Sequence, residues 1–120
     1  MSKVLDRLRD LLRAEDDIVA DELRSEATAR GCTAVAEAVD RQVVTVAGTI
    51  RSVTLRPEQS VPALVAELYD GTTPVNLVWL GRREIRGIRP GVYLRASGRL
   101  CRSTRSATIY NPSYDIVPTA

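Results

Sequence analysis

The chain has 120 residues, of which 44% are hydrophobic and 27% charged, with two Cys, one Trp, no Phe and no His. This composition predicts a single domain whose modest core is built from Val, Leu, Ile and Ala. Without His, and with Cys32 and Cys101 far apart, the chain lacks the ligand set of a zinc site, so we expect no metal and no cofactor. No apolar run approaches the ~20 residues that span a bilayer, and nothing resembles a signal peptide. We therefore expect no membrane association and a cytoplasmic protein with reduced thiols.

Charge divides the chain into two parts. Residues 1–41 carry seven Lys or Arg against ten Asp or Glu, whereas residues 42–120 carry ten Arg against five Asp or Glu. This asymmetry predicts an anionic partner for the second part. Sixteen of the 17 basic residues are Arg, whose planar guanidinium binds phosphate and stacks on bases. A coding bias toward Arg would explain that preference but not the segregation of charge.

The first 41 residues are expected to form an α-helical extension. Leu and Val recur at helical spacing over residues 2–12, a second helix runs from Asp16 or Asp17 to about Arg30, and Gly31 ends it. A short helical turn is expected within residues 33–41. The acidic cluster at residues 15–22 favours a helix start over a metal site. The apolar stripe of these helices must be buried on the barrel, on a second copy or on another protein, and the sequence leaves the three open.

Residues 42–117 predict five strands, at 42–55, 62–70, 73–81, 91–101 and 106–117. Apolar and polar residues alternate in most of them, with a bulge expected near Ser52 and a hairpin turn at Asp70-Gly71. Residues 82–88 are expected to make helical turns, with Ile85 and Ile88 plugging the open end. This order predicts a small closed β-barrel that is filled by its own side chains, so its chemistry must lie outside.

The segments VTVAGTIRSV, AELYDGTTPVNLVWLG, PGVYLRASGRL and IYNPSYDI resemble an OB-fold of the nucleic-acid-binding type. The nearest likeness is to small actinobacterial OB-fold proteins, and the barrel is also similar to the wedge domain of branch-migration helicases and to anticodon-binding modules. The resemblance covers about two-thirds of the chain. It implies a mainly β protein with a five-stranded OB-fold barrel over residues 42–120 and a helical extension over residues 1–41.

OB-folds bind strands across the face of their second and third strands, between the first and last hairpin loops. Mapped onto this sequence, the resemblance implies phosphate-binding arginines gathered on one flank, and aromatic and amide side chains that meet the bases. These residues are Arg51, Arg56, Tyr69, Asn76, Trp79, Arg82, Arg83, Arg102 and Arg105, with Arg86 close by. Trp79 has a second interpretation as a core residue, because both faces of its strand are apolar. Tyr110 and Tyr114 share a strand face unless Pro112 interrupts it, and Asn-Pro favours a turn there.

Catalysis is not expected. A Ser or Cys nucleophile would lack its commonest base because the chain has no His, and its glycines match no phosphate-binding loop. The leading hypothesis is a non-enzymatic protein that binds single-stranded DNA or RNA with little sequence specificity. The alternative is a protein-interaction module, in which the barrel is a scaffold and the acidic helical arm meets a partner or a second copy.

Overall fold

The computed structural model describes residues 7, 17–27, 31–56 and 61–118. Residues 17–27 are helical, and a 3-10 turn, η1, follows at Val35–Glu37. The strands are β1 Val43–Arg56, β2 Ala63–Tyr69, β3 Pro74–Leu80, β4 Tyr93–Arg102, β5 Ala107–Tyr110 and β6 Ser113–Ile116. The protein is mainly β with a helical extension, as predicted. The helix predicted over residues 2–12 lies outside the described residues, except for Arg7, which is helical.

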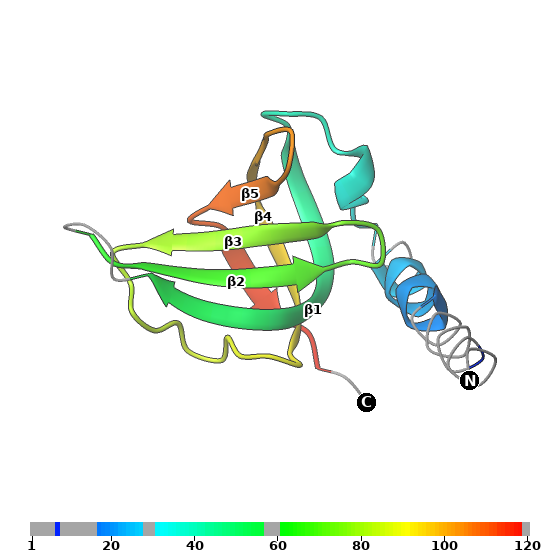
Figure 1. Ribbon diagram of the computed structural model, residues 1–120, viewed down its shortest axis with the longest axis horizontal. Helices are drawn as coiled ribbons and strands as arrows, with labels where there is room; N and C mark the ends of the chain where they lie inside the picture. The colour runs from blue at the N-terminus through cyan, green and yellow to red at the C-terminus, as the bar shows by residue number, and fades with distance from the viewer. Residues whose placement is uncertain (1–6, 8–16, 28–30, 57–60, 119–120) are drawn as a thin grey trace.

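Five of the strands close into a barrel (Figure 1). The first half of β1 pairs with β4, and its second half pairs with β2. The β2–β3 hairpin follows, β3 runs parallel to β5, and β5 returns antiparallel to β4. The resulting circuit β1-β2-β3-β5-β4-β1 is the predicted OB-fold barrel, to which β6 adds a pairing with β4.

Two features of β1 let this strand pair with β4 along its first half and with β2 along its second half. A Cβ on Gly48 would lie 2.2 Å from the carbonyl oxygen of Tyr69, so glycine permits the close crossing of β1 over the end of β2. The register of the β1–β2 pair then shifts between Ile50 and Ser52, which confirms the predicted bulge. Bulges increase local twist and bend a strand, and here the bend directs β1 from β4 to β2.

The barrel is filled by apolar side chains. The predicted inward faces of β2 and β4 are confirmed, since Leu64, Ala66, Leu68, Leu94, Ala96 and Leu100 are all buried in one cluster. In β3 the inward residues are Val75, Leu77 and Trp79. Ile85 and Ile88 join the same cluster and close one end of the barrel, as expected.

The β3–β4 connection is not helical, so the helical turns predicted over residues 82–88 are wrong. Gly81, Gly87 and Gly91 all have positive φ, from 76° to 91°. Gly87 lies within residues 82–88, and its left-handed conformation interrupts a right-handed helical run there. The connection therefore crosses the barrel end in turns, with its two isoleucines pointing in.

The final predicted strand is two strands. Asn111 has φ 50° and Pro112 follows it, so β5 ends and β6 begins on another part of β4, opposite residues 94–97 instead of 100–102. The side chain of Asn111 accepts a hydrogen bond from the Leu80 N–H at 3.0 Å. This confirms the turn interpretation of Asn-Pro and explains why Tyr110 and Tyr114 occupy different environments.

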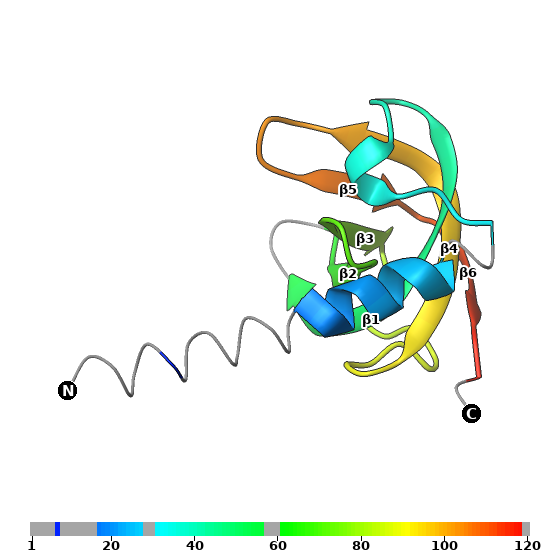
Figure 2. The same ribbon diagram turned by 90° about the vertical axis from the view of Figure 1, so that its right-hand side faces the viewer.

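The described helix packs across the outside of the barrel (Figure 2). Leu23, Ala27 and Cys32 cover Ala47 of β1 and Tyr93 of β4. The Cys32 N–H donates to the Ala27 carbonyl at 3.0 Å, and Gly31 has φ 74°, which is the predicted glycine closure of a helix. The sequence left open whether the apolar stripe is buried on the barrel, on a second copy or on another protein. Residues 17–27 bury theirs on the barrel.

Asp70, in the β2–β3 turn, joins this helix to the barrel. Its fully buried carboxylate accepts hydrogen bonds from the Val35 N–H at 2.8 Å and from the N–H and hydroxyl of Thr72 at 2.9 and 2.6 Å. The Arg24 guanidinium lies 3.5 Å from the same carboxylate. A Cβ on Gly71 would lie 2.1 Å from the Ala20 carbonyl oxygen, so the helix rests directly on the turn.

Candidate functional site

The outer face of β2, β3 and β5 lies on the side of the barrel that faces the viewer in Figure 1, and on it Val65 and Val78 are buried whereas Tyr110 is 54% exposed. Strand register sets its side chains in two rows. One row runs from Glu67 through Asn76 to Thr108, and the next from Val65 through Val78 to Tyr110. We call this surface the outer face, and it is the face on which the resemblance predicted binding.

A groove of about 390 Å³ lies where the outer face meets the β4–β5 hairpin loop. Its walls come from three segments of the chain, listed here as Glu67, Thr73, Pro74, Asn76, Arg102, Ser103, Thr104, Arg105, Ser106 and Ala107. The predicted site residues Asn76 and Arg105 therefore meet across it. Within the described residues, the side chains of Glu67, Asn76 and Arg105 make no hydrogen bond or ion pair, so their polar atoms face solvent or a ligand.

Arg102 also lines the groove, but part of its guanidinium donates hydrogen bonds within the protein. Its Nε–H donates to the Ala38 carbonyl at 3.1 Å, and its Nη2–H to the Val35 carbonyl. Its backbone N–H donates to Asp40 Oδ1 at 2.7 Å. Arg102 thus fastens the η1 segment to β4 with two of its five guanidinium N–H donors, and its contact with phosphate stays a prediction.

Trp79 is not a stacking surface. Its side chain is only 6% exposed, its indole N–H donates to the Pro112 carbonyl at 3.2 Å, and its ring meets Tyr114 edge-on at a centroid distance of 5.7 Å. The prediction that Trp79 stacks on a base is therefore wrong, and the alternative that it belongs to the core is confirmed. The aromatic ring that Trp79 contacts, Tyr114, belongs to the protein itself.

The predicted residues Arg51 and Tyr69 lie together. The Arg51 Cζ is 3.6 Å from the centroid of the Tyr69 ring, so the guanidinium covers one face of that ring. Arg51 is exposed and Tyr69 is half-buried. The pair offers a cation at the edge of the outer face, beside the β1 bulge.

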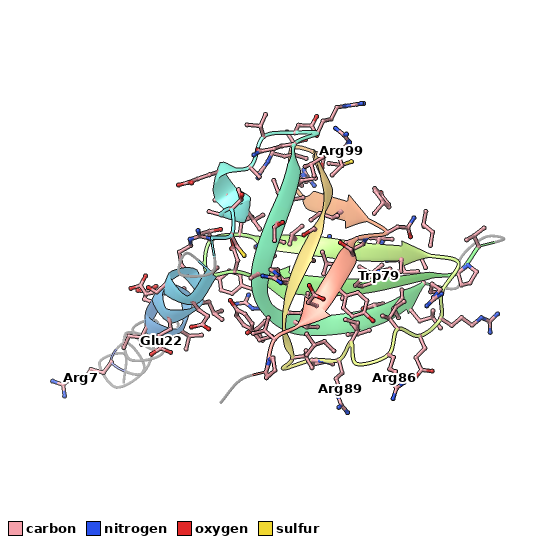
Figure 3. The ribbon with its side chains drawn as sticks, turned by 180° about the vertical axis from the view of Figure 1, so that it is seen from behind. Arg7, Glu22, Trp79, Arg86, Arg89 and Arg99 are labelled. Atoms are coloured by element: carbon pink, nitrogen blue, oxygen red, sulfur yellow. The ribbon has the colours of Figure 1, made fainter. Side chains whose placement is uncertain are left out.

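Several arginines lie at the end of β1 and along the β3–β4 connection. Strand register places Arg56 beside Ala63 and Ala63 beside Leu80, where the β3–β4 connection starts. Figure 3 shows Arg86 and Arg89 projecting from that connection, away from the barrel. We define the basic end as Arg56, Arg82, Arg83, Arg86 and Arg89, all of them exposed. None of the five side chains has an ion pair or hydrogen bond with another described residue.

The positive charge does not lie on one flank, which corrects the expectation from the sequence. Arg95 pairs with Asp115 at 3.3 Å on the β4–β6 side, and Arg99 donates to the Arg41 carbonyl at 2.7 Å. Figure 3 shows Arg99 far from Arg86 and Arg89. Segregation in the sequence therefore becomes four groups in space: the basic end, Arg51 over Tyr69, Arg105 in the groove, and the β4 residues Arg95, Arg99 and Arg102.

Tyr110 is an exposed aromatic residue that the predicted site did not include. Its side chain is 54% exposed beside Val78, whereas Tyr114 packs against Trp79 and donates its hydroxyl to the Arg86 carbonyl at 3.1 Å. The signal was present in the sequence, because the residue after a buried Ile109 must point outward. Tyr110 brings an open ring to the outer face.

Comparison with known proteins bears on the fold. No protein-family model matches the chain, and no curated protein matches it. One similar solved structure is described as RecG bound to a three-way DNA junction, with a TM-score of 0.50 and 22% identity. The match covers 68% of this chain but only 12% of that chain, so this protein corresponds to a small portion of the larger one. The likeness agrees with an OB-fold barrel.

No helix among the described residues is both long enough and apolar enough to cross a membrane.

Proposed function

We propose that this protein binds single-stranded DNA or RNA across the outer face of its barrel and carries out no catalysis. The observation that carries the proposal is the basic end. Within the described protein the side chains of its five arginines make no hydrogen bond or ion pair, and the outer face of β2, β3 and β5 holds one carboxylate, Glu67, and one exposed ring, Tyr110. Guanidinium groups that are not used internally remain available to a polyanion.

The dimensions of the outer face suit a short strand. The seven residues of β3 extend about 20 Å at about 3.3 Å per residue. An OB barrel covers about 4–16 nucleotides, so a bound strand would run from the basic end to the groove. Arginines at both ends would neutralise phosphates, and Tyr110 would stack on one base between them.

Backbone contacts of this kind carry little sequence information. We therefore expect affinity to depend mainly on charge and to fall steeply with added salt. The DNA-bound state of the similar solved structure supports nucleic acid as the class of ligand, and the choice of single strands rests on the exposed ring of Tyr110, on which an unpaired base can stack.

A salt titration tests the proposal. Binding of labelled single strands is measured by fluorescence anisotropy for the wild-type protein, for Arg82→Gln with Arg86→Gln, and for Arg95→Gln with Arg99→Gln as the charge-matched control. For single strands each lost phosphate contact lowers the slope of log K against log salt by about 0.7. We expect a loss of up to about 1.4 in the first variant and little change in the control.

The outcomes separate the alternatives. Failure of the wild-type protein to bind any single strand at about 50 mM salt, where the electrostatic term is strong, would overturn the proposal and favour the protein-interaction module. A loss confined to Arg95→Gln with Arg99→Gln would place the interface on the β4 side, whereas an equal loss in both double variants would indicate a general effect of charge. Thermal unfolding of each variant shows that the substitutions leave the barrel folded.

A further inference from the structure

One side chain on the outer face does not fit a surface that binds only phosphate. Glu67 is the only carboxylate on the outer face of β2, β3 and β5, and it lines the groove without an ion pair to any described residue. A carboxylate there repels phosphate. The part of a nucleotide that can approach Glu67 favourably is a base edge that carries hydrogen-bond donors.

Glu67 acts together with Asn76. The two are directly opposite each other on β2 and β3, which sets their Cβ atoms about 4.5–5.5 Å apart on the same face. An ionised carboxylate only accepts hydrogen bonds, whereas the Asn amide can donate as well as accept. Side by side they present an acceptor next to a donor, and neither is satisfied within the described protein.

When the 4- or 6-position of the base faces Glu67 and the adjacent ring nitrogen faces Asn76, two bases carry the complementary edge. Cytosine presents its 4-amino group beside N3, and adenine presents its 6-amino group beside N1, in each case a donor next to an acceptor. Uracil, thymine and guanine present a carbonyl oxygen at that position, and in this orientation the oxygen would face the Glu67 carboxylate. Carboxylates that accept from the cytosine amine and Asn side chains that pair with adenine are established modes of base recognition.

We propose that the groove is a base-reading site that holds the base with its 4- or 6-position toward Glu67, so that Glu67 and Asn76 select a nucleotide with an amine there, cytosine or adenine, against uracil, thymine and guanine. The inference rests on the proposed function and adds one selective position to an otherwise sequence-tolerant surface. Arg105 stands on the far wall of the groove, where its cation can meet the phosphate of the same nucleotide.

Hydrogen bonds hold the β4–β5 hairpin loop, which forms the far wall of the groove. The Ser103 N–H donates to the Ser106 carbonyl at 2.9 Å, which closes the hairpin loop, and the Arg102 guanidinium ties the base of that loop to η1. On the near wall, Glu67 and Asn76 belong to a regular strand ladder. Sites held by rigid elements discriminate better than mobile loops, because less ordering is required on binding.

The test compares oligo-dC with oligo-dU of equal length at one ionic strength. These strands share a backbone and a ring size, and their bases differ at the exocyclic group and at N3. We expect the wild-type protein to bind oligo-dC about fivefold to tenfold more tightly, at the low end of the discrimination measured for paired base contacts. Glu67→Ala should bring the two affinities together, and Asn76→Ala should narrow the difference.

Glu84→Ala is the matched control, since it removes one exposed carboxylate from the basic end and leaves the groove intact. It should raise affinity for both strands equally and keep their ratio. Salt-sensitive binding with equal affinity for the two strands would overturn the base-reading site while leaving the proposed function standing. Retention of the preference in Glu67→Ala would also overturn it. Absence of binding to either strand would instead reject the proposed function.

Discussion

The guanidinium of Arg51 lies over the ring of Tyr69, with its Cζ 3.6 Å from the ring centroid. The β1 bulge creates this contact, because the register shift between Ile50 and Ser52 leaves Arg51 outside the ladder. The ring of Tyr69 is thus covered on one face by a cation from the neighbouring strand. A nucleobase that reached this corner would meet the exposed guanidinium before it met the ring.

The first prediction is an energetic coupling between these two side chains. In a double-mutant cycle with Arg51→Gln and Tyr69→Leu, we expect a coupling free energy of unfolding of about 0.5–1 kcal/mol, the usual size of an exposed cation–π contact. Chemical denaturation of the four proteins measures it. Strictly additive effects of the two substitutions would show that the contact does not persist in solution.

Tyr110 is predicted to contribute to binding rather than to stability. Tyr110→Ala should weaken binding of single strands by about 1–3 kcal/mol, the cost of losing one base stack. Leu80→Ala is the control, since Leu80 is 49% exposed and Tyr110 is 54% exposed on the same face. Leu80 offers no π-surface, so its truncation should change affinity little. Equal losses in the two variants would indicate apolar contact rather than stacking.

Trp79 is predicted not to contact bound nucleic acid. It is the single Trp of the chain, and its buried ring sits against Tyr114. Its fluorescence should therefore be blue-shifted, resistant to aqueous quenchers and unchanged by oligonucleotides. Trp79→Phe should lower the free energy of unfolding by about 1–3 kcal/mol, because the hydrogen bond to Pro112 and part of the packing are lost. Strong quenching by a bound strand would contradict the buried position.

Asp70 is predicted to be the most sensitive polar position. Asp70→Ala leaves the Val35 and Thr72 N–H groups without their acceptor and removes the partner of Arg24. We expect a loss of about 3–5 kcal/mol in the free energy of unfolding.

The control for this position is Asp115→Ala. Asp115 also pairs with an arginine, Arg95, but its side chain is 73% exposed, so its loss should cost less than about 1 kcal/mol. Similar losses in Asp70→Ala and Asp115→Ala would show that the carboxylate of Asp70 does not join the helix to the barrel.

Much of the barrel follows from local pattern. Alternation in β2 and β4 identified their inward residues, and Asp70-Gly71 identified the hairpin, because both features depend only on neighbouring positions. The conformation of the β3–β4 connection could not be predicted from local pattern. Its apolar pair Ile85 and Ile88 fits a helix, but three left-handed glycines override that spacing, and positive φ is not visible in a hydrophobic pattern.

The candidate site was harder to predict because its contacts join distant segments. Asn76 meets Arg105 only because β3 and β5 are parallel neighbours. Arg102 looked available in the sequence, yet the carbonyls it binds lie 64 and 67 positions earlier in the chain. Trp79 was ambiguous since β3 is apolar on both faces, and only closure of the barrel decides which face is inside.

The parallel pairing of β5 with β3 has a consequence for synthesis on the ribosome. A nascent chain that has emerged only through Arg102 has made β1 to β4, while β3 and most of the second half of β4 still lack the neighbour that β5 provides. Two open backbone edges are then exposed at once, and such edges invite pairing with other chains.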